Sequence, residues 1–147
     1  DAESAYNTIR NNTFNVEGSA TFRVREVIAV DGSAHNQIIG NTFEKAVGGG
    51  VYLYRNCGEG GTVRHQSPQY NVIENNNFNL TGLNWGNYGI WLGSRNGNRN
   101  YCSADEGHKF GSSIDNGDFA DYNTVKGNKF SGSDGTIQND GKNNLIQ

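Results

Sequence analysis

The sequence has no methionine, a single proline (Pro68) and only two cysteines, and hydrophobic residues make up 33% of its 147 positions. No apolar run approaches the roughly 18 residues of a membrane-spanning helix, which argues against a membrane partner. Basic residues (12) do not outnumber acidic ones (15) and form no stripe, which argues against nucleic-acid binding. This proportion of hydrophobic residues is low for a protein with one large core, but it suits a narrow core built from stacked repeats.

Glycine and asparagine are abundant, with 21 and 23 residues. Both residue types readily occupy positive-φ and tight-turn positions, which a chain that turns every few residues needs. The length suits a single domain, which we expect to span residues 1–147.

An eight-residue phrase, Asn-x-Ile/Val-x-x-Asn-x-Phe, occurs four times in full. The copies begin at Asn7, Asn36, Asn71 and Asn123, and a fifth, shorter copy begins at Asn144. The spacings between these starts are 29, 35, 52 and 21 residues. Repeats at periods of roughly 20 to 50 residues indicate a solenoid, propeller or array. The phrase alternates with a period of two around its aliphatic residue, so we interpret it as a short strand ending in a turn.

A second strand is predicted after each phrase, at residues 27–30, 50–54, 89–93 and 136–138. Alternation with a period of two points Val51 and Leu53 inward and Tyr52 outward. Trp91 occupies the equivalent outward position one coil later. Each coil then has two or three short strands, with loops added in the longer coils.

Stacking the coils about 4.8 Å apart places equivalent residues above one another. Four ladders are predicted. The internal aliphatic ladder contains Ile9, Ile38, Ile73, Val125 and Ile146, and the internal aromatic ladder contains Phe14, Phe43, Phe78 and Phe130. The asparagine ladder contains Asn12, Asn41, Asn76 and Asn128, and the residues before the phrases form a ladder of Tyr6, His35, Tyr70 and Tyr122. In the asparagine ladder each amide is expected to bond its neighbours above and below, which satisfies buried polar groups at a tight turn.

The repeated phrase and its second strand resemble the right-handed parallel β-helix superfamily. That superfamily includes pectate-lyase-like enzymes, alginate and chondroitin lyases, mannuronan C5-epimerases, phage tailspikes and many secreted bacterial repeat proteins. The resemblance covers nearly the whole chain and implies an all-β, right-handed parallel β-helix solenoid of about five coils. The Asp cluster with which pectate-lyase-like enzymes bind Ca²⁺, and the Asp-Pro-His signature of the epimerases, are absent from this sequence. From the positions of the first and last phrases we expect a fragment of a longer solenoid, or ends that pack on other coils or chains.

Two long insertions follow the second strands of consecutive repeats, at about 54–68 and 94–121. Insertions in phase lie on one face of a solenoid, which is often the binding face. Cys57 and Cys102 fall in these two insertions. A disulfide between them fits the repeat alignment and implies an oxidising, extracytoplasmic setting. Two reduced thiols are the alternative, and a metal site is disfavoured because neither cysteine belongs to a C-x-x-C pair.

Glu59, Arg64 and His65, in the first insertion, are the catalytic candidates. If the substrate is a uronate sugar, Arg64 can bind its carboxylate in a bidentate manner and His65 can serve as the base. Glu59 can orient the histidine, or hold Ca²⁺ together with Asp105 or Glu106. No other cofactor is expected. The alternative is a structural network of the three side chains that closes a glycine-rich loop.

The substrate-binding candidates are aromatic and basic residues beside or within the insertions: Tyr52, Tyr54, Arg55, Trp91, Arg95 and His108. Tyr52 and Trp91 align in adjacent coils, and with Tyr54 and Trp85 they can form an apolar platform for sugar rings. The alternatives are packing of the aromatic rings beneath the long loops and a solvated loop position for His108.

The expected protein is a secreted, periplasmic or cell-surface β-helix that engages an extracellular polysaccharide. If it is catalytic, it is a lyase or C5-epimerase that acts on acidic glycans. The alternative is a non-catalytic glycan-binding, adhesive or structural module of the kind found in tailspikes and on cell surfaces. Catalytic candidates that line an open groove beside Tyr52 and Trp91 would favour catalysis or binding, whereas their burial under the loop would exclude catalysis.

Overall fold

The computed structural model describes residues 4–16, 24–55, 66–93 and 118–147. This part of the chain forms short strands and no helix. The strands are β1 (Thr8–Arg10), β2 (Thr13–Val16), β3 (Ile28–Asp31), β4 (Gln37–Ile39), β5 (Thr42–Ala46), β6 (Val51–Tyr54), β7 (Val72–Glu74), β8 (Asn77–Asn79), β9 (Ile90–Leu92), β10 (Thr124–Lys126), β11 (Lys129–Ser131), β12 (Ile137–Asn139) and β13 (Leu145–Ile146).

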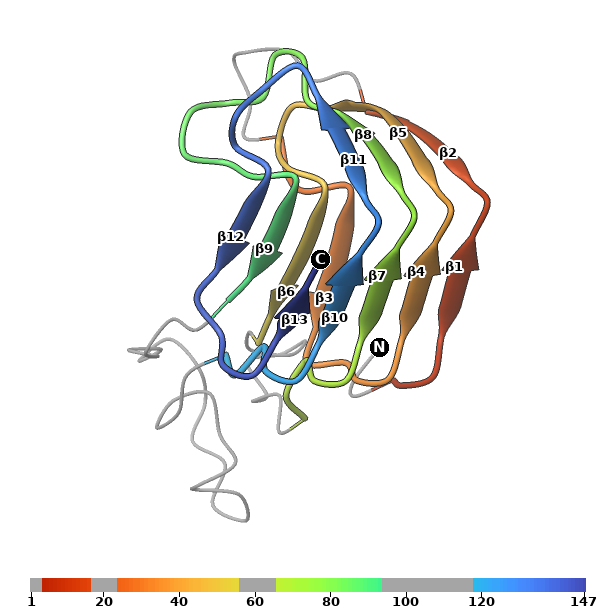
Figure 1. Cartoon of the computed structure of the whole chain (residues 1–147), viewed down its shortest axis with the longest axis vertical. Helices are drawn as coiled ribbons and strands as arrows, with labels where there is room; N and C mark the ends of the chain where they lie inside the picture. Colours follow the sequence, from red (N-terminus) through yellow and green to blue (C-terminus); the bar gives the residue numbers. More distant parts are fainter. Residues whose placement is uncertain (1–3, 17–23, 56–65, 94–117) are drawn as a thin grey trace.

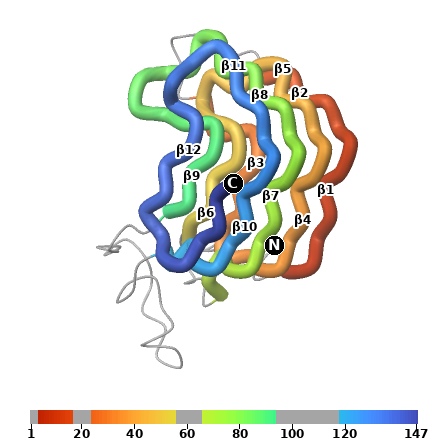
Figure 2. Tube along the Cα trace, viewed as in Figure 1, coloured from red at the N-terminus to blue at the C-terminus, as the bar shows by residue number. Residues whose placement is uncertain are grey.

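The strands make three parallel sheets, and each coil contributes one strand to each sheet (Figure 1). The sheets run β1-β4-β7-β10-β13, β2-β5-β8-β11 and β3-β6-β9-β12. The chain trace therefore winds through four coils and enters a fifth with β13 (Figure 2). This arrangement confirms the predicted parallel β-helix.

The eight-residue phrase forms two strands, where the sequence pattern was interpreted as one strand ending in a turn. Between them, the fifth residue of each phrase has a left-handed backbone, with φ between 55° and 65° at Asn11, Gly40, Asn75 and Gly127. Asparagine and glycine tolerate this conformation better than other residues. The turn sends the phenylalanine that follows into the second sheet, and the predicted second strand becomes the third of each coil.

The core consists of ladders in the predicted register. Ile9 pairs with Ile38, Ile38 with Ile73, and Ile73 with Val125. Phe43 and Phe78 are buried, and their ring centroids lie 4.3 Å apart with the planes inclined by 9°. Parallel in-register pairing thus places like side chains on like side chains throughout the narrow interior.

Two asparagine ladders run along the turns, one more than the sequence predicted. In the predicted ladder, Asn41 donates its backbone N–H and its side-chain amide to Oδ1 of Asn76, at 2.8 and 3.0 Å. The same pair of bonds joins Asn36 to Asn71, at 2.9 and 2.8 Å, in a ladder built from the first residue of each phrase. Each buried amide therefore spans two coils and satisfies a backbone donor as well.

The residues before the phrases form an exposed aromatic stack at a corner of the solenoid. Adjacent rings are nearly parallel, with centroids 4.8 Å apart for Tyr6 and His35, 5.2 Å for His35 and Tyr70, and 5.5 Å for Tyr70 and Tyr122. All four residues have a positive φ. The predicted place of His35 as a member of the tyrosine ladder is confirmed.

Candidate functional site

The outer face of sheet β3-β6-β9-β12 carries the strongest candidate site. Tyr52 pairs in register with Trp91, and Trp91 with Gln138. Their strand neighbours Val51, Leu53, Ile90 and Leu92 are fully buried, whereas Tyr52 and Trp91 are partly exposed. The predicted inward and outward positions of these residues are therefore confirmed.

Tyr52 is held in a fixed orientation by backbone on two sides. Its hydroxyl accepts a hydrogen bond from the backbone N–H of Tyr88 at 2.9 Å. Its ring lies against Gly49, which has φ of 117°, and a Cβ at Gly49 would lie only 2.4 Å from Cζ and the hydroxyl oxygen of Tyr52. Burial raises the pKa of Tyr52, so its hydroxyl keeps its proton and can donate it to a ligand.

Trp91 stands nearly perpendicular to Tyr52 and is tied to a carboxylate. The two ring centroids lie 5.5 Å apart with an interplanar angle of 80°. The indole Nε1–H of Trp91 donates to Oδ2 of Asp140 at 2.7 Å, and the amide of Gln138 donates to Oδ1 of the same residue. The carboxylate thus orients the indole and keeps lone pairs for further donors.

These side chains line a shallow pocket of about 320 Å³ together with Gly86, Asn87 and Tyr88. The three residues belong to the loop between β8 and β9, which projects from the ends of the strands (Figure 1, green). A turn closes this loop, because the N–H of Asn87 donates to the carbonyl of Asn84 at 3.1 Å. The turn presents Trp85 with its side chain fully exposed. A large apolar ring held out in water beside a pocket is typical of a binding surface.

Tyr54 lies next along the same sheet, but it is buried. Its hydroxyl donates to Glu26 at 2.6 Å and accepts from Arg25 at 2.7 Å, and its ring centroid lies 6.2 Å from that of Trp91. Burial and the Glu26 carboxylate raise the pKa of Tyr54 well above its ordinary value. Burial alone would raise the pKa of Glu26, but the hydrogen bonds from Tyr54 and Arg25 lower it. This cluster supports the site from behind and does not open onto it.

Arg55 is buried as well, with 2% of its surface exposed. Its backbone N–H donates to Oδ1 of Asp118 at 2.9 Å, and its guanidinium carbon lies 5.5 Å from the ring centroid of Phe119. We therefore carry neither Tyr54 nor Arg55 into the candidate site. The other predicted site residues lie outside the described residues, and so do the predicted disulfide partners: Glu59, Arg64, His65, Arg95 and His108, with Cys57 and Cys102.

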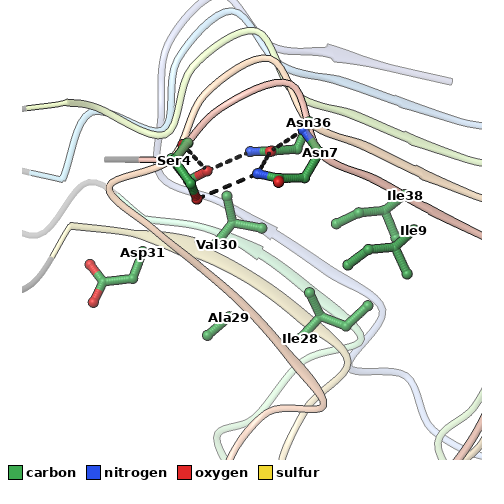
Figure 3. Close-up of a pocket in the computed structure, with 10 residues that line it drawn as sticks. Ser4, Asn7, Ile9, Ile28, Ala29, Val30, Asp31, Asn36 and Ile38 are labelled. Atoms are coloured by element: carbon green, nitrogen blue, oxygen red, sulfur yellow. Dashed lines mark hydrogen bonds between the residues drawn. The ribbon is translucent and has the colours of Figure 1, made fainter. Parts of the chain in front are cut away.

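Two further pockets are weaker candidates for a binding site. One, of about 230 Å³, lies at the first coil, where Ile9 and Ile38 face Ile28 and Val30 across the interior (Figure 3). Its lining combines these core side chains with polar ones such as Ser4 and Asn7. The other, of about 300 Å³, lies on sheet β2-β5-β8-β11 and is lined by polar side chains such as Glu44 and Lys129 and by phenylalanines of the core ladder.

Within the described ranges, no group of three or more His, Cys, Asp or Glu side chains is placed to hold a metal ion. The predicted Ca²⁺ ligands Glu59, Asp105 and Glu106 fall outside those ranges. The same ranges contain no helix that is long and apolar enough to span a membrane.

No family model matches this chain, and neither the curated proteins nor the solved structures contain a match to it.

Tyr88, Gln138 and Asp140 join the site without having been predicted from the sequence. The repeat did carry a signal for Gln138, because the third strand of the fourth coil places it in phase with Trp91. Asp140 follows two residues later, on the same side of the chain. Tyr88 lies in the loop between β8 and β9, which is longer than the equivalent loops of the second and fourth coils, so no repeat pattern marks it.

Proposed function

We propose that this chain is a glycan-binding β-helix that holds a polysaccharide against the outer face of sheet β3-β6-β9-β12. The observation that carries the proposal is the pocket in which the perpendicular rings of Tyr52 and Trp91 meet Gln138 and Asp140. Sugar-binding sites combine an aromatic surface for the C–H faces of the ring with a few fixed polar groups for its hydroxyls.

The geometry suits a pyranose ring. One ring face of the sugar can pack on an aromatic face while its edge meets the second ring. The Tyr52 hydroxyl can donate to a sugar oxygen, and the Asp140 carboxylate can accept from sugar hydroxyls. The site is ordered before binding, because Tyr52, Trp91 and Asp140 already have fixed partners. Preorganisation of this kind reduces the entropy cost of binding.

The Trp85 loop extends the platform for a longer chain of sugars. Trp85 follows Asn84 and precedes Gly86 in the turn, and Gly86 lines the pocket. A polysaccharide that occupies the pocket can then stack a neighbouring unit on the exposed indole. Affinity is expected to rise with oligosaccharide length until both aromatic surfaces are covered.

The class of fold agrees with this proposal, since the sequence resembles the pectate-lyase-like β-helix superfamily, many members of which act on or bind polysaccharides. Fold alone does not define function, so the proposal rests on the pocket. A secreted, periplasmic or cell-surface location is proposed with it, because such a ligand is extracellular and a Cys57–Cys102 disulfide would need an oxidising compartment.

The test is a binding measurement on a panel of soluble oligosaccharides, by isothermal titration calorimetry, with Trp91→Ala and Tyr52→Ala. Each substitution is expected to weaken binding about five- to thirtyfold, since sugar stacking on one ring contributes on the order of 1–2 kcal/mol. Tyr122→Ala is the matched control, because it removes an exposed aromatic ring from another corner of the solenoid. Binding that survives both site variants, or that Tyr122→Ala weakens equally, would rule out this face as the glycan site.

Lyase or C5-epimerase chemistry on uronate glycans stays a prediction from the sequence, because Glu59, Arg64 and His65 lie outside the described residues. It is tested by assaying unsaturated uronate products, and C5 epimerisation, with the chain and with His65→Ala. Product that disappears in His65→Ala would support a catalytic site in the first insertion. No product from either protein would leave the non-catalytic binding module.

A further inference from the structure

We propose that the Tyr52–Trp91 pocket selects sugars that carry a protonated amino group, such as glucosamine units, over uronate sugars. This inference rests on the proposed glycan-binding function and names the class of sugar that the same pocket takes. It departs from the acidic glycans that the resemblance of the sequence implies.

The described residues that line the pocket give it a negative charge. Among the described residues that line it, Asp140 is the one with a formal charge. Its two oxygens accept from the indole of Trp91 and the amide of Gln138, and both of these donors are neutral. The carboxylate therefore keeps its full charge and is exposed to solvent. A carboxylate has about four acceptor positions, so two remain for a ligand.

The charged residues that the structure describes beside the pocket do not reverse this sign. Arg25 contacts the Tyr54 hydroxyl, but it also pairs with Glu26 at 3.0 Å, so that the pair adds no net charge. A uronate in the pocket would bring its own carboxylate close to Asp140, and like charges at short range repel.

The aromatic walls favour the same ligand. An ammonium group is attracted to the faces of indole and phenol rings, most strongly to indole. Here two such rings stand at 80° to each other, and the carboxylate is tied to one of them. A protonated amine at this corner can meet a ring face and Asp140 at once. A neutral sugar can still stack, but it lacks the ion pair and the cation–π contact.

The probes are glucosamine oligosaccharides, their N-acetylated counterparts and oligouronates, all of one length, titrated into the protein by calorimetry at low and high salt. The glucosamine series is expected to bind about fivefold more tightly than the N-acetylated series at low salt. This advantage should shrink at high salt, because salt screens an exposed ion pair. The uronates are expected to bind most weakly.

Asp140→Asn is the decisive variant, because the amide keeps the shape and an acceptor for the Trp91 indole but removes the charge. It should abolish the preference for glucosamine while weakening the N-acetylated series much less. Glu44→Gln is the matched control, since it makes the same change of net charge on sheet β2-β5-β8-β11 and should leave the preference intact.

The other possible results of these titrations would overturn either the amino-sugar inference or the proposed function. Equal affinities for the three series, or a preference for uronates, would overturn the amino-sugar inference and leave glycan binding standing. A preference that survives Asp140→Asn would show that Asp140 does not select the ligand. A preference that Glu44→Gln also abolishes would show that net charge, and not the pocket, selects it. Absence of binding by all three series, in a panel where other glycans fail as well, would overturn the proposed function itself.

Discussion

The buried asparagines of the repeat both accept and donate hydrogen bonds between coils. Asn76 accepts from the backbone and side-chain amide of Asn41, donates to Oδ1 of Asn128 at 2.9 Å, and donates to the carbonyl of Ile38 at 2.9 Å. The residue is fully buried, so every one of these groups depends on a protein partner. Aspartate would lack the donors and serine would lack the reach.

Asn76→Ala is expected to lower the free energy of unfolding by about 2 to 4 kcal/mol, because it leaves the backbone N–H of Asn41 and one of its two side-chain N–H groups buried without an acceptor. Urea unfolding followed by circular dichroism measures the change. Asn77→Ala is the control, since the next residue is exposed and should change stability by no more than about 0.5 kcal/mol. Similar losses in both variants would show that strand propensity, and not the ladder, sets the cost.

Also at the residue scale, period-two alternation along a strand predicts the orientation of the site residues but not their burial. Tyr52 and Trp91 were predicted outward because their neighbours are aliphatic, and the structure agrees. Tyr54 obeys the same alternation but is buried, because Glu26 and Arg25 reach its hydroxyl from another part of the chain. Alternation gives the side of a strand on which a residue lies, but not what covers that side.

At the scale of elements, a partly buried hydrogen-bonded cluster connects the segment before β3 to the end of β6. Glu26 accepts from the Tyr54 hydroxyl and from Arg25, and these bonds lower the pKa of Glu26 despite its burial. A carboxyl group whose pKa is lower in the folded protein than in the unfolded chain stabilises the fold when it is ionised. Its contribution is present above the ordinary pKa of glutamate and is lost as the pH falls through the lowered value.

Glu26→Gln should therefore remove part of the decrease in folding stability that the protein shows as the pH falls. The stability difference between the wild type and the variant is expected to be largest near about pH 6 and to shrink as the pH falls below the ordinary pKa of glutamate. Its size should stay below about 1 kcal/mol, because Arg25 is largely exposed and water screens the pair. Urea midpoints across this pH range measure it, and Glu44→Gln, at an exposed position, serves as the control. A difference that grows toward low pH would contradict the assigned direction of the shift.

The elements themselves were predictable where the repeat is regular. The phrases and their following strands placed eight of the first twelve strands, within about one or two residues at each end: β1, β3, β4, β6, β7, β9, β10 and β12. The division of the phrase into two strands was missed, although its fifth position holds only asparagine or glycine. The loop that carries Trp85 and Tyr88 could not be predicted, since it is not part of the repeated phrase and its shape depends on contacts such as the bond from the N–H of Asn84 to the carbonyl of Val47.

At the scale of the whole molecule, the described strands of each coil contact only those of the coils above and below it. Strand contacts occur between neighbours in each sheet, as between β5 and β8 or β8 and β11. The stability of such a solenoid is approximately a sum over coils and the interfaces between them. Equivalent residues should therefore differ in importance according to the number of neighbours that their coil has.

The phenylalanine ladder gives a direct measure of this effect. Phe78 is stacked between Phe43 and Phe130, with centroids at 4.3 and 5.0 Å, whereas Phe14 stacks on Phe43 alone, at 5.1 Å, and is only partly buried. Phe78→Ala is expected to cost about 3 to 5 kcal/mol, the usual range for a buried phenylalanine, and Phe14→Ala about half of that or less.

Urea unfolding of the two variants and the wild type, followed by circular dichroism, measures both costs and the dependence of the free energy on urea. The two side chains have the same chemistry and the same place in the phrase, so each variant serves as the control for the other. A smaller urea dependence in Phe14→Ala, with the transition midpoint unchanged, would indicate that the first coil separates on its own. Equal costs at the two positions would contradict nearest-neighbour additivity and would mean that the solenoid unfolds as one rigid unit.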